Sequence, residues 1–162
     1  MTQSQAAVIQ VESLVKRFGE LTAVAGVSFE VARGEVFGIL GPNGAGKTTA
    51  LECIEGLQTP SGGRAAVLGI DTQEHADRVK ARIGVQLQAS AYFEQLTLTE
   101  ILDLFGRMYP TRLPPLDLLA RVDLVEKAKT TVNKLSGGQK QRFTLAASLV
   151  NDPEMVILDE PT

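Results

Sequence analysis

Apolar and polar residues nearly alternate in two short stretches close to the start of the chain. Residues 8–14 (VIQVESL) and 27–31 (VSFEV) show this spacing, and the KRFGE segment between them contains a turn glycine, Gly19. Alternation with a period of two is typical of a strand that buries one face. The pattern therefore predicts antiparallel β structure in this part of the chain.

Short uninterrupted apolar runs mark a second kind of strand. Such runs are too short for helices and suit strands that are buried on both faces. They are residues 36–40 (VFGIL), 83–87 (IGVQL) and 155–158 (MVIL), and a further short strand is expected at 65–68.

Helical patterns follow several of these strands. Residues 48–55 are expected to form a helix that Gly56 stops, since glycine suits the position after a helix end. Thr97 and Glu100 have the spacing of a capping box, so a helix should begin near Thr97 and end before Pro110. Other helix-compatible stretches are 72–82, 116–128 and 143–150, the last broken by Asn151, Asp152 and Pro153.

Composition excludes several classes of protein. With 162 residues, 44% hydrophobic and 22% charged, the chain suits one globular domain or most of a larger one. A net charge of -3, a pI near 5.2 and the lack of a basic run argue against a nucleic-acid partner. The longest apolar runs are about five residues, and the polar start lacks a signal pattern, so we expect a soluble chain that is not secreted by itself.

The candidate chemistry begins directly after the VFGIL run. The sequence GPNGAGKTT fits a phosphate-binding loop, in which backbone N–H groups cradle the α- and β-phosphates of a nucleotide, Lys reaches the β/γ oxygens and a hydroxyl binds Mg²⁺. Gly44 and Gly46 let the backbone turn and approach the phosphates, and the next helix directs its N–H groups at them. The alternative is a plain glycine turn between strand and helix. The predicted ATP-binding residues are Gly41, Pro42, Asn43, Gly44, Ala45, Gly46, Lys47, Thr48 and Thr49.

Two carboxylates follow the last apolar strand. Strands of a parallel sheet present ligand-binding residues at their carboxyl ends, and this strand delivers Asp159 and Glu160 there. Asp159 can hold Mg²⁺ together with Thr48, and Glu160 can polarise the water that attacks the γ-phosphorus. The alternative is a pair of solvated acids.

Two further sites carry polar groups of interest. Ser136, Gly137 and Gly138 open a helix, so a hydroxyl and bare backbone N–H groups form a second anion site; alone, they also fit a flexible turn with an N-cap. Gln88 at a strand end can bind the metal or orient water, although a lone glutamine also suits a surface position.

These motifs together resemble the ATP-binding cassette family, the ATPase subunits of ABC transporters. GPNGAGKT is similar to its Walker A motif, LSGGQKQR to its signature, MVILDEPT to its Walker B motif, and Gln88 to the glutamine of its Q-loop, in the family's order. The signature separates this family from other P-loop ATPases. The resemblance, which runs from residue 8 to 162, implies an α/β P-loop NTPase fold with a RecA-like parallel core sheet.

The resemblance also implies a division of the chain. An antiparallel β subdomain would comprise residues 6–36 with 64–70, the catalytic core residues 36–57, 83–88 and 154–162, and the helical signature subdomain residues 93–142. Phe18 sits where the family places the aromatic that stacks on adenine, although alone it reads as a core aromatic. Gln86 competes with Gln88 for the Q-loop position, and the spacing from Ile83 and Gly84 favours Gln88.

Partners and location are implied in the same way. ATP and Mg²⁺ would be sandwiched between two such domains, in a homodimer, with Ser136, Gly137, Gly138 and Gln139 contacting the ATP held by the partner. Hydrolysis would drive a separate membrane permease, so the chain would sit peripherally on the cytoplasmic side of the cell membrane. The stretches ECIEGLQTPSGG and IGVQLQ are similar to bacterial exporter ATPases of the multidrug and antibiotic-resistance type.

The chain departs from the family pattern after Thr162. Family members continue with an Asp-bearing loop and a strand followed by a switch histidine. His75 cannot fill that role because it precedes Gln88, and we expect it at an exposed helical position. We expect Cys53 to be a small buried side chain. We therefore expect a fragment of a longer domain or an incomplete sequence, prone to aggregate and poorly active. Two alternatives stay open: a soluble ABC ATPase acting on ribosomes or DNA, and a nucleotide-binding scaffold without catalysis.

Overall fold

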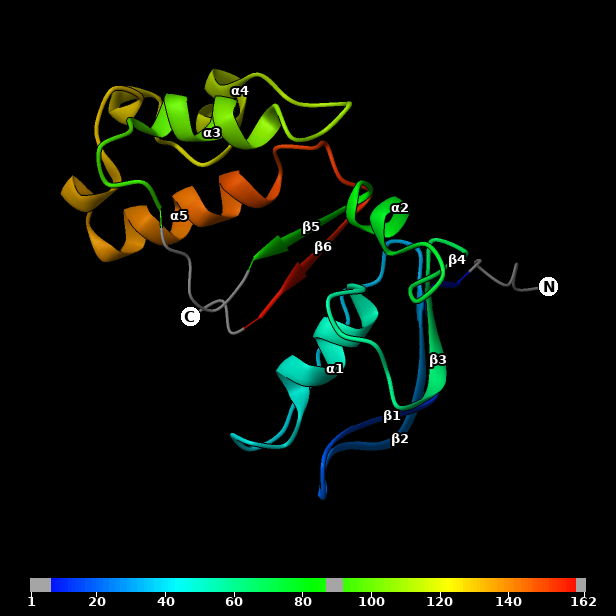
Figure 1. The fold of residues 1–162 in the computed structure, drawn as a ribbon. Helices are drawn as coiled ribbons and strands as arrows, with labels where there is room; N and C mark the ends of the chain where they lie inside the picture. The colour runs from blue at the N-terminus through cyan, green and yellow to red at the C-terminus, as the bar shows by residue number, and fades with distance from the viewer. Residues whose placement is uncertain (1–6, 87–91, 160–162) are drawn as a thin grey trace. The chain divides into compact units, whose positions relative to one another are not determined.

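The structure, a computed structural model, describes residues 7–86 and 92–159 of the chain. The chain forms two compact units, Met1–Lys80 and Ala81–Thr162. In the first unit, the elements are β1 (Ala7–Phe18), β2 (Leu21–Ala32), α1 (Lys47–Ile54), β3 (Gly62–Val67), β4 (Ile70–Asp71) and α2 (Ala76–Lys80) (Figure 1). In the second, they are β5 (Ile83–Gln86), α3 (Leu98–Gly106), α4 (Pro115–Arg121), the 3-10 turns Val125–Lys127 and Val132–Lys134, α5 (Gly137–Ser148) and β6 (Met155–Leu158).

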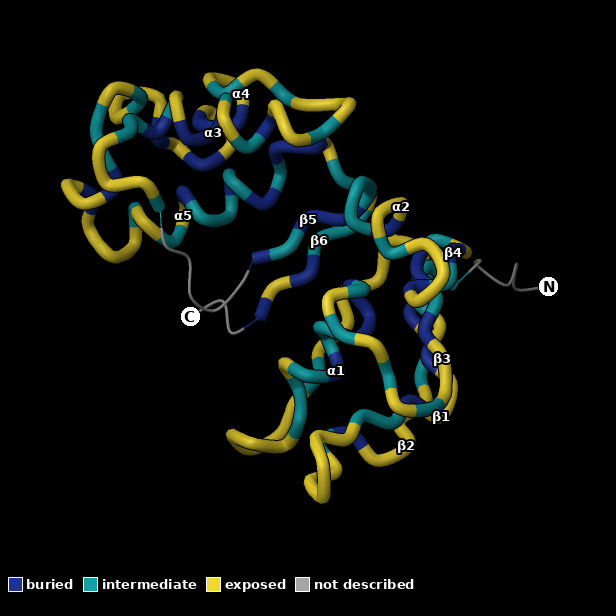
Figure 2. The backbone as a smooth tube through the Cα atoms, in the orientation of Figure 1, coloured by how far each residue is buried: buried dark blue, intermediate teal, exposed yellow. Residues whose placement is uncertain are grey.

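An antiparallel sheet in the order β2-β1-β3-β4 forms the frame of the first unit. β1 and β2 make the predicted hairpin, and Gly19 turns between them with a φ of +57°. Helix α1 packs against β1, β2 and β3. Its predicted end is confirmed, because Gly56 follows it with a φ of +72°. Figure 2 shows the buried part of α1 and the strands as dark segments; the buried residues of these elements are Val11, Leu14, Val24, Val31, Ala50, Cys53, Ile54, Ala65 and Val67.

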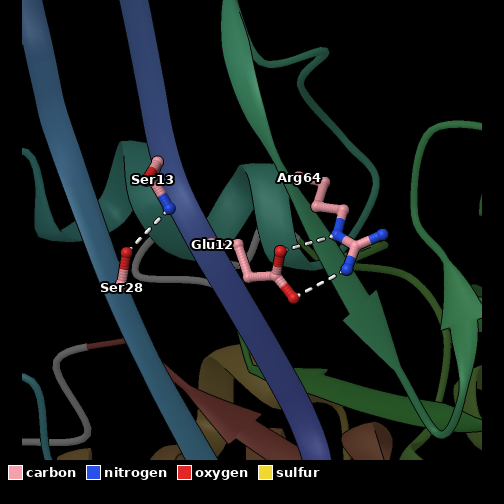
Figure 3. A network of polar contacts seen from close by, with 4 residues as sticks. All are labelled: Glu12, Ser13, Ser28 and Arg64. Atoms are coloured by element: carbon pink, nitrogen blue, oxygen red, sulfur yellow. Dashed lines mark hydrogen bonds and ion pairs between the residues drawn. The ribbon is translucent and has the colours of Figure 1, made fainter.

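A bulge interrupts β1 at Ser13. Val11 pairs with Phe29 and Leu14 with Val27, so two residues of β1 face one residue of β2 at this point. Ser13 has a φ of +46°, and its N–H donates to Ser28 Oγ at 2.7 Å (Figure 3). The extra residue explains why Val11 and Leu14, three apart, are both buried although a regular strand alternates faces every residue.

The neighbouring strand is shaped to fit this bulge. Gly63 of β3 has a φ of +72°, and a Cβ on it would lie 2.2 Å from the Ser13 carbonyl oxygen, so only glycine fits. Beside it, Arg64 and Glu12 pair across the strands through two hydrogen bonds of 2.9 and 2.7 Å (Figure 3). The hydrogen bond from Arg64 lowers the pKa of the exposed Glu12 carboxyl.

The predicted buried strand at residues 36–40 is wrong. The structure has no strand there, and the side chains of Val36 and Leu40 are 100% and 95% exposed. Phe37 stacks on Phe29 with ring centroids 4.9 Å apart. A buried strand needs hydrogen-bonded neighbours, and none of the described residues pairs with this stretch, so its apolar composition alone does not make it a strand.

A parallel pair of short strands lies in the second unit. Ile83 pairs with Met155 and Gln86 with Leu158, which confirms both predicted strands over the described residues. Leu87, the last residue of the predicted first strand, lies outside the described part. β5 contacts α5, the helix that precedes β6 in the chain.

Helices α3, α4 and α5 share one apolar core. α3 begins with the predicted capping box: the Thr97 side chain accepts from the Glu100 N–H at 3.3 Å, and the Glu100 carboxylate accepts from the Thr97 N–H at 2.8 Å. The predicted short helices at 116–128 appear as α4 and a 3-10 turn. The core comprises Leu98, Ile101, Leu102, Leu118, Leu119, Val122, Leu124, Val132, Leu135, Phe143, Ala146 and Val150.

Three smaller predictions concern the first unit and the membrane. Cys53 is fully buried, as predicted, and burial raises the pKa of its thiol. His75 is exposed as expected but immediately precedes the short helix α2. Within the described ranges, every helix falls short of the length and hydrophobicity that a bilayer-spanning segment needs.

Candidate nucleotide-binding site

The phosphate loop leads into α1 through a left-handed residue. Gly46, the N-cap, has a φ of +82°, and its carbonyl accepts the first helical hydrogen bond, from Ala50, at 2.8 Å. A Cβ on Gly46 would lie 2.1 Å from the carbonyl oxygen of Ala23. Ala23 is itself an extra residue in β2, because Lys16 pairs with Val24 and Arg17 with Thr22. The backbone of the hairpin at Ala23 therefore lies directly against the start of α1, and only glycine can occupy position 46.

Lys47 lies across the loop that precedes it. Its ammonium donates to the carbonyl oxygens of Gly41 at 2.9 Å and Pro42 at 3.0 Å. The Ala45 N–H donates to the Pro42 carbonyl at 3.2 Å, and Gly44 takes a φ of +82°. The loop is thus closed on itself by its own lysine, with residues 41–45 and Thr48 exposed to solvent.

The start of α1 is suited to an anion. No side chain of the described residues caps this helix, so its first N–H groups lack the side-chain acceptor that a capped helix has. These N–H groups, the positive end of the helix dipole and the Lys47 ammonium together favour a polyphosphate.

Phe18 stands at the end of β1. Its side chain is 47% exposed, so it is not the core aromatic that the sequence alone also allowed. The Lys16 ammonium lies 5.0 Å from the ring centroid. Stacking on a base stays a prediction, and the exposed ring is compatible with it.

The Ser136 turn opens α5 with a complete capping box. Ser136 Oγ accepts from the Gln139 N–H at 3.3 Å, and the side-chain oxygen of Gln139, Oε1, accepts from the Ser136 N–H at 3.0 Å. A Cβ added at Gly137 or Gly138 would meet no heavy atom within 4 Å. The turn is therefore an ordered helix start with two exposed glycines. The Ser-x-x-Gln spacing that signals this box is present in the sequence, yet our prediction recognised only the N-cap.

Asp159 lies at the end of β6, as predicted. The residue is 7% exposed, and its N–H donates to the Gln86 carbonyl at the end of β5, at 3.1 Å. Gln86 is buried as well. Gln88 and Glu160 lie outside the described residues, so their predicted roles stay predictions.

The prediction missed two residues that hold β5 in place. Asn151, buried after α5, donates through its amide to the carbonyls of Ala81 at 3.2 Å and Ile83 at 2.9 Å. Gly84 lets the backbone of Ser148 approach, since a Cβ there would lie 2.1 Å from the Ser148 oxygen. Both contacts join residues far apart in the sequence, and no local pattern could have revealed them.

Two of the predicted metal ligands, one in each unit, lie within the described residues. In the described part of the chain, no cluster of three or more His, Cys, Asp or Glu side chains could hold a metal. Thr48 offers a hydroxyl and Asp159 a carboxylate, both hard oxygen donors. Mg²⁺ typically takes one or two carboxylates and completes its shell with substrate phosphates and water, so each of these two oxygen donors is of a kind that it accepts.

Comparison with known sequences decides the family. Residues 24–162 match the family described as ABC transporter. The chain belongs to the ABC transporter family. The prediction from the phosphate loop, the signature and the acidic strand end is thereby confirmed.

Several relatives within the ABC transporter family share more than 40% identity with the chain. It is 43% identical to a Nod factor export ATP-binding protein I of Ralstonia nicotianae, over 96% of this chain and 50% of that protein. It is 43% identical to a daunorubicin resistance ATP-binding protein of Streptomyces coeruleorubidus (95% and 50%) and 42% identical to a fluoroquinolones export ATP-binding protein of Mycobacterium tuberculosis (96% and 52%). The chain spans about half the length of these relatives.

Solved structures of ABC cassettes have the same fold. An ATP-binding subunit of an ABC transporter superposes with a TM-score of 0.82 at 28% identity, covering 95% of this chain and 66% of that one. A dimeric ATP-binding cassette in a post-hydrolysis state, bound to ADP and Pi, superposes equally well, with 95% and 74% coverage. The predicted α/β P-loop NTPase fold is thus confirmed, while the predicted subdomain boundaries stay a prediction.

Proposed function

We propose that this chain is the ATP-binding and ATP-hydrolysing part of an ABC exporter, acting with a separate membrane permease. The observation that carries the proposal is the start of α1, entered through the left-handed Gly46, without a capping side chain and with Lys47 folded onto the loop. This arrangement presents helix N–H groups and an ammonium to one anion.

ATP would bind with its phosphates on the loop, residues Gly41–Thr49, and its base on Phe18. Lys47 would leave the carbonyls of Gly41 and Pro42 for the β- and γ-phosphate oxygens, exchanging two neutral acceptors for charged ones. Thr48, Asp159 and Gln88 would hold Mg²⁺, which neutralises charge that develops on the phosphates.

Hydrolysis needs a base beside the attacking water. Glu160 would accept a proton from the water while the water oxygen bonds to the γ-phosphorus and the bond between the γ-phosphorus and the ADP oxygen breaks. Gln88 would orient the water. The buried Asp159 backbone, tied to Gln86, supports this arrangement by fixing the strand end immediately before Glu160.

The signature would act on a second copy of the chain. Ser136, Gly137, Gly138 and Gln139 would close on the γ-phosphate held by the partner, so that ATP joins two domains and hydrolysis releases them. The ordered turn with two exposed glycines supports this role, since an approaching phosphate would meet backbone N–H groups and no side chain.

The cycle would power export at the cytoplasmic side of the cell membrane. The relatives' names concern Nod factor export, daunorubicin resistance and fluoroquinolones export. We therefore propose a drug-like or antibiotic compound as cargo, moved by an integral membrane permease to which this chain attaches.

Glu160→Gln tests the proposal in the full-length protein. We expect the variant to bind ATP, to accumulate as an ATP-bound dimer in size-exclusion chromatography, and to lose at least about 100-fold in turnover, because the amide cannot take the proton. Glu126→Gln, a change at an exposed residue of the second unit, is the matched control and should behave as wild type. A monomeric Glu160→Gln variant with unaltered hydrolysis would contradict the proposal.

A second experiment tests the partner. The tagged protein should co-purify with an integral membrane subunit, and its ATPase rate should respond to that subunit. Co-purification with ribosomes or DNA instead would support the alternative soluble ABC ATPase.

A further inference from the structure

Lys16 occupies an unusual place beside the exposed aromatic of the site. It lies on β1 two residues before Phe18, so both side chains are on the same face of the strand. Its ammonium is 5.0 Å from the centroid of the Phe18 ring and donates to the Thr59 carbonyl at 2.8 Å. One ammonium thus contacts both the ring and the segment that follows α1.

The same segment is tied to β1 at two further points. The Ser61 N–H donates to the Val15 carbonyl at 2.7 Å, and the Arg17 N–H donates to Ser61 Oγ at 3.0 Å. The backbone on both sides of Lys16 is therefore fixed relative to residues 59–61. Since Thr59 is anchored in this way, the hydrogen bond to its carbonyl holds the Lys16 ammonium in one position.

A fixed cation beside an aromatic ring restricts the ring. The electrostatic attraction between an ammonium and the ring face favours one orientation of Phe18, whose side chain is otherwise 47% exposed. A restricted ring loses less freedom when a flat ligand stacks on it, so the ligand binds more tightly.

The hairpin that carries the ring is also set against the phosphate loop. The carbonyl of Ala23 approaches Gly46 so closely that no Cβ fits between them. A ring fixed on the hairpin therefore stands at a fixed offset from the helix entry where the phosphates are proposed to bind.

We propose that Lys16 is a positioning residue that orients Phe18 for stacking on the base of the nucleotide. This inference rests on the proposed binding of ATP with its base on Phe18. Lys16 would contribute to the affinity for the base of the nucleotide and not to the affinity for its phosphates.

The test compares two probes on the full-length protein, Mg²⁺-ATP and Mg²⁺ with inorganic tripolyphosphate, which lacks the base. Lys16→Met keeps the length of the side chain and removes the charge. We expect it to weaken ATP binding about two- to fivefold, the range of an exposed cation–π contact, and to leave tripolyphosphate binding unchanged. Lys16→Arg should restore ATP affinity, because a guanidinium can also contact the ring and donate to Thr59.

Arg17→Met is the matched control. It removes one positive charge from the adjacent residue, while the Arg17 backbone bond to Ser61 is kept. Equal weakening of ATP binding by Arg17→Met and Lys16→Met would show a general charge effect and overturn the inference. Equal weakening of ATP and tripolyphosphate by Lys16→Met would also overturn it, as would unchanged ATP affinity.

A fluorescent reporter gives an independent measurement. In a Phe18→Trp protein, Lys16→Met should lower the fluorescence anisotropy of the indole and raise its quenching by acrylamide; no change in either would contradict the inference. Phe18→Ala separates this inference from the proposed function. If Phe18→Ala weakens ATP binding and Lys16→Met does not, only the role of Lys16 fails; if neither does, the base-stacking role of Phe18 fails as well.

Discussion

The two helix starts that carry the glycine motifs are built in opposite ways. α1 begins at the left-handed Gly46, and none of the described side chains caps it. α5 begins at Ser136, whose hydroxyl and backbone are both engaged in a capping box with Gln139. One helix start therefore leaves its N–H groups to be satisfied from outside, whereas the other already satisfies two donors internally.

This difference indicates how each start can meet a phosphate. The α1 start can offer an anion backbone N–H groups that no side-chain cap of the described residues occupies, which suits stable binding. The α5 start has spare donors only where its glycines are exposed, which suits a contact that forms and breaks. Four measurements test this difference between the two helix starts.

The largest effect is expected from Gly46→Ala. The new Cβ would lie 2.1 Å from the Ala23 oxygen in a backbone conformation that disfavours alanine. We expect a loss of about 2–3 kcal/mol in the free energy of unfolding and at least tenfold weaker ATP binding, measured by urea unfolding and ATP titration. Gly44→Ala, with the same φ of +82° but no neighbour within 4 Å, should cost only about 1 kcal/mol. Equal costs would show that the approach of Ala23 is unimportant.

Ser136→Ala should have the next largest effect. Loss of the N-cap should lower the free energy of unfolding by about 1 kcal/mol, and loss of the proposed phosphate contact should lower ATP turnover. Thr97→Ala removes the same kind of cap from α3 and is the control for stability. It should cost a similar amount while turnover stays close to wild type. If both variants lose turnover equally, the effect of Ser136 is structural.

Gly138→Ala should change stability and activity in opposite directions. A Cβ at this helical position meets open space, so alanine should stabilise the protein by about 0.5 kcal/mol. The same Cβ would stand where a phosphate is proposed to approach, and ATP turnover should fall. A more stable variant with full turnover would contradict the proposed role of the exposed glycines.

The smallest expected effect is a difference between the capping boxes of α3 and α5 in how their contribution to stability depends on pH. Hydrogen bonds from the backbone and side chain of Thr97 lower the pKa of Glu100 in the folded protein. A group with a lowered pKa stabilises the fold above its unfolded pKa, about 4.3, and loses that contribution as the pH falls through the folded value. The stability difference between wild type and Glu100→Gln should therefore be constant above about pH 6 and shrink below about pH 4.5.

The corresponding change in α5 provides the comparison. Gln139 does not titrate, so the stability difference between wild type and Gln139→Ala should stay constant over the same range of pH. Acid unfolding monitored by circular dichroism measures both. A pH-dependent difference for Gln139→Ala would show that the acid sensitivity comes from elsewhere.

Local signals in the sequence predicted several helix starts and ends well. The box at Thr97 and Glu100, the stop at Gly56 and the helix entry at Gly46 all depend on residues within a few positions of one another. The strand predicted at residues 36–40 failed because a strand depends on neighbours that its own residues do not specify. The contacts of Lys16 with Thr59 and of Asn151 with Ile83 were missed for the same reason, since each joins segments that only the folded backbone brings together.

The bulge at Ser13 determines which side of the sheet every later residue of β1 occupies. Side chains of a strand alternate between two faces, and an inserted residue reverses that alternation for the rest of the strand. If Ser13 were paired as an ordinary strand residue instead of being accommodated in the bulge, Lys16 and Phe18 would lie on the opposite face, with their identities and spacing intact. The bulge at Ser13, a residue without any proposed contact to ATP, thus determines the face of the hairpin on which the Phe18 side chain lies.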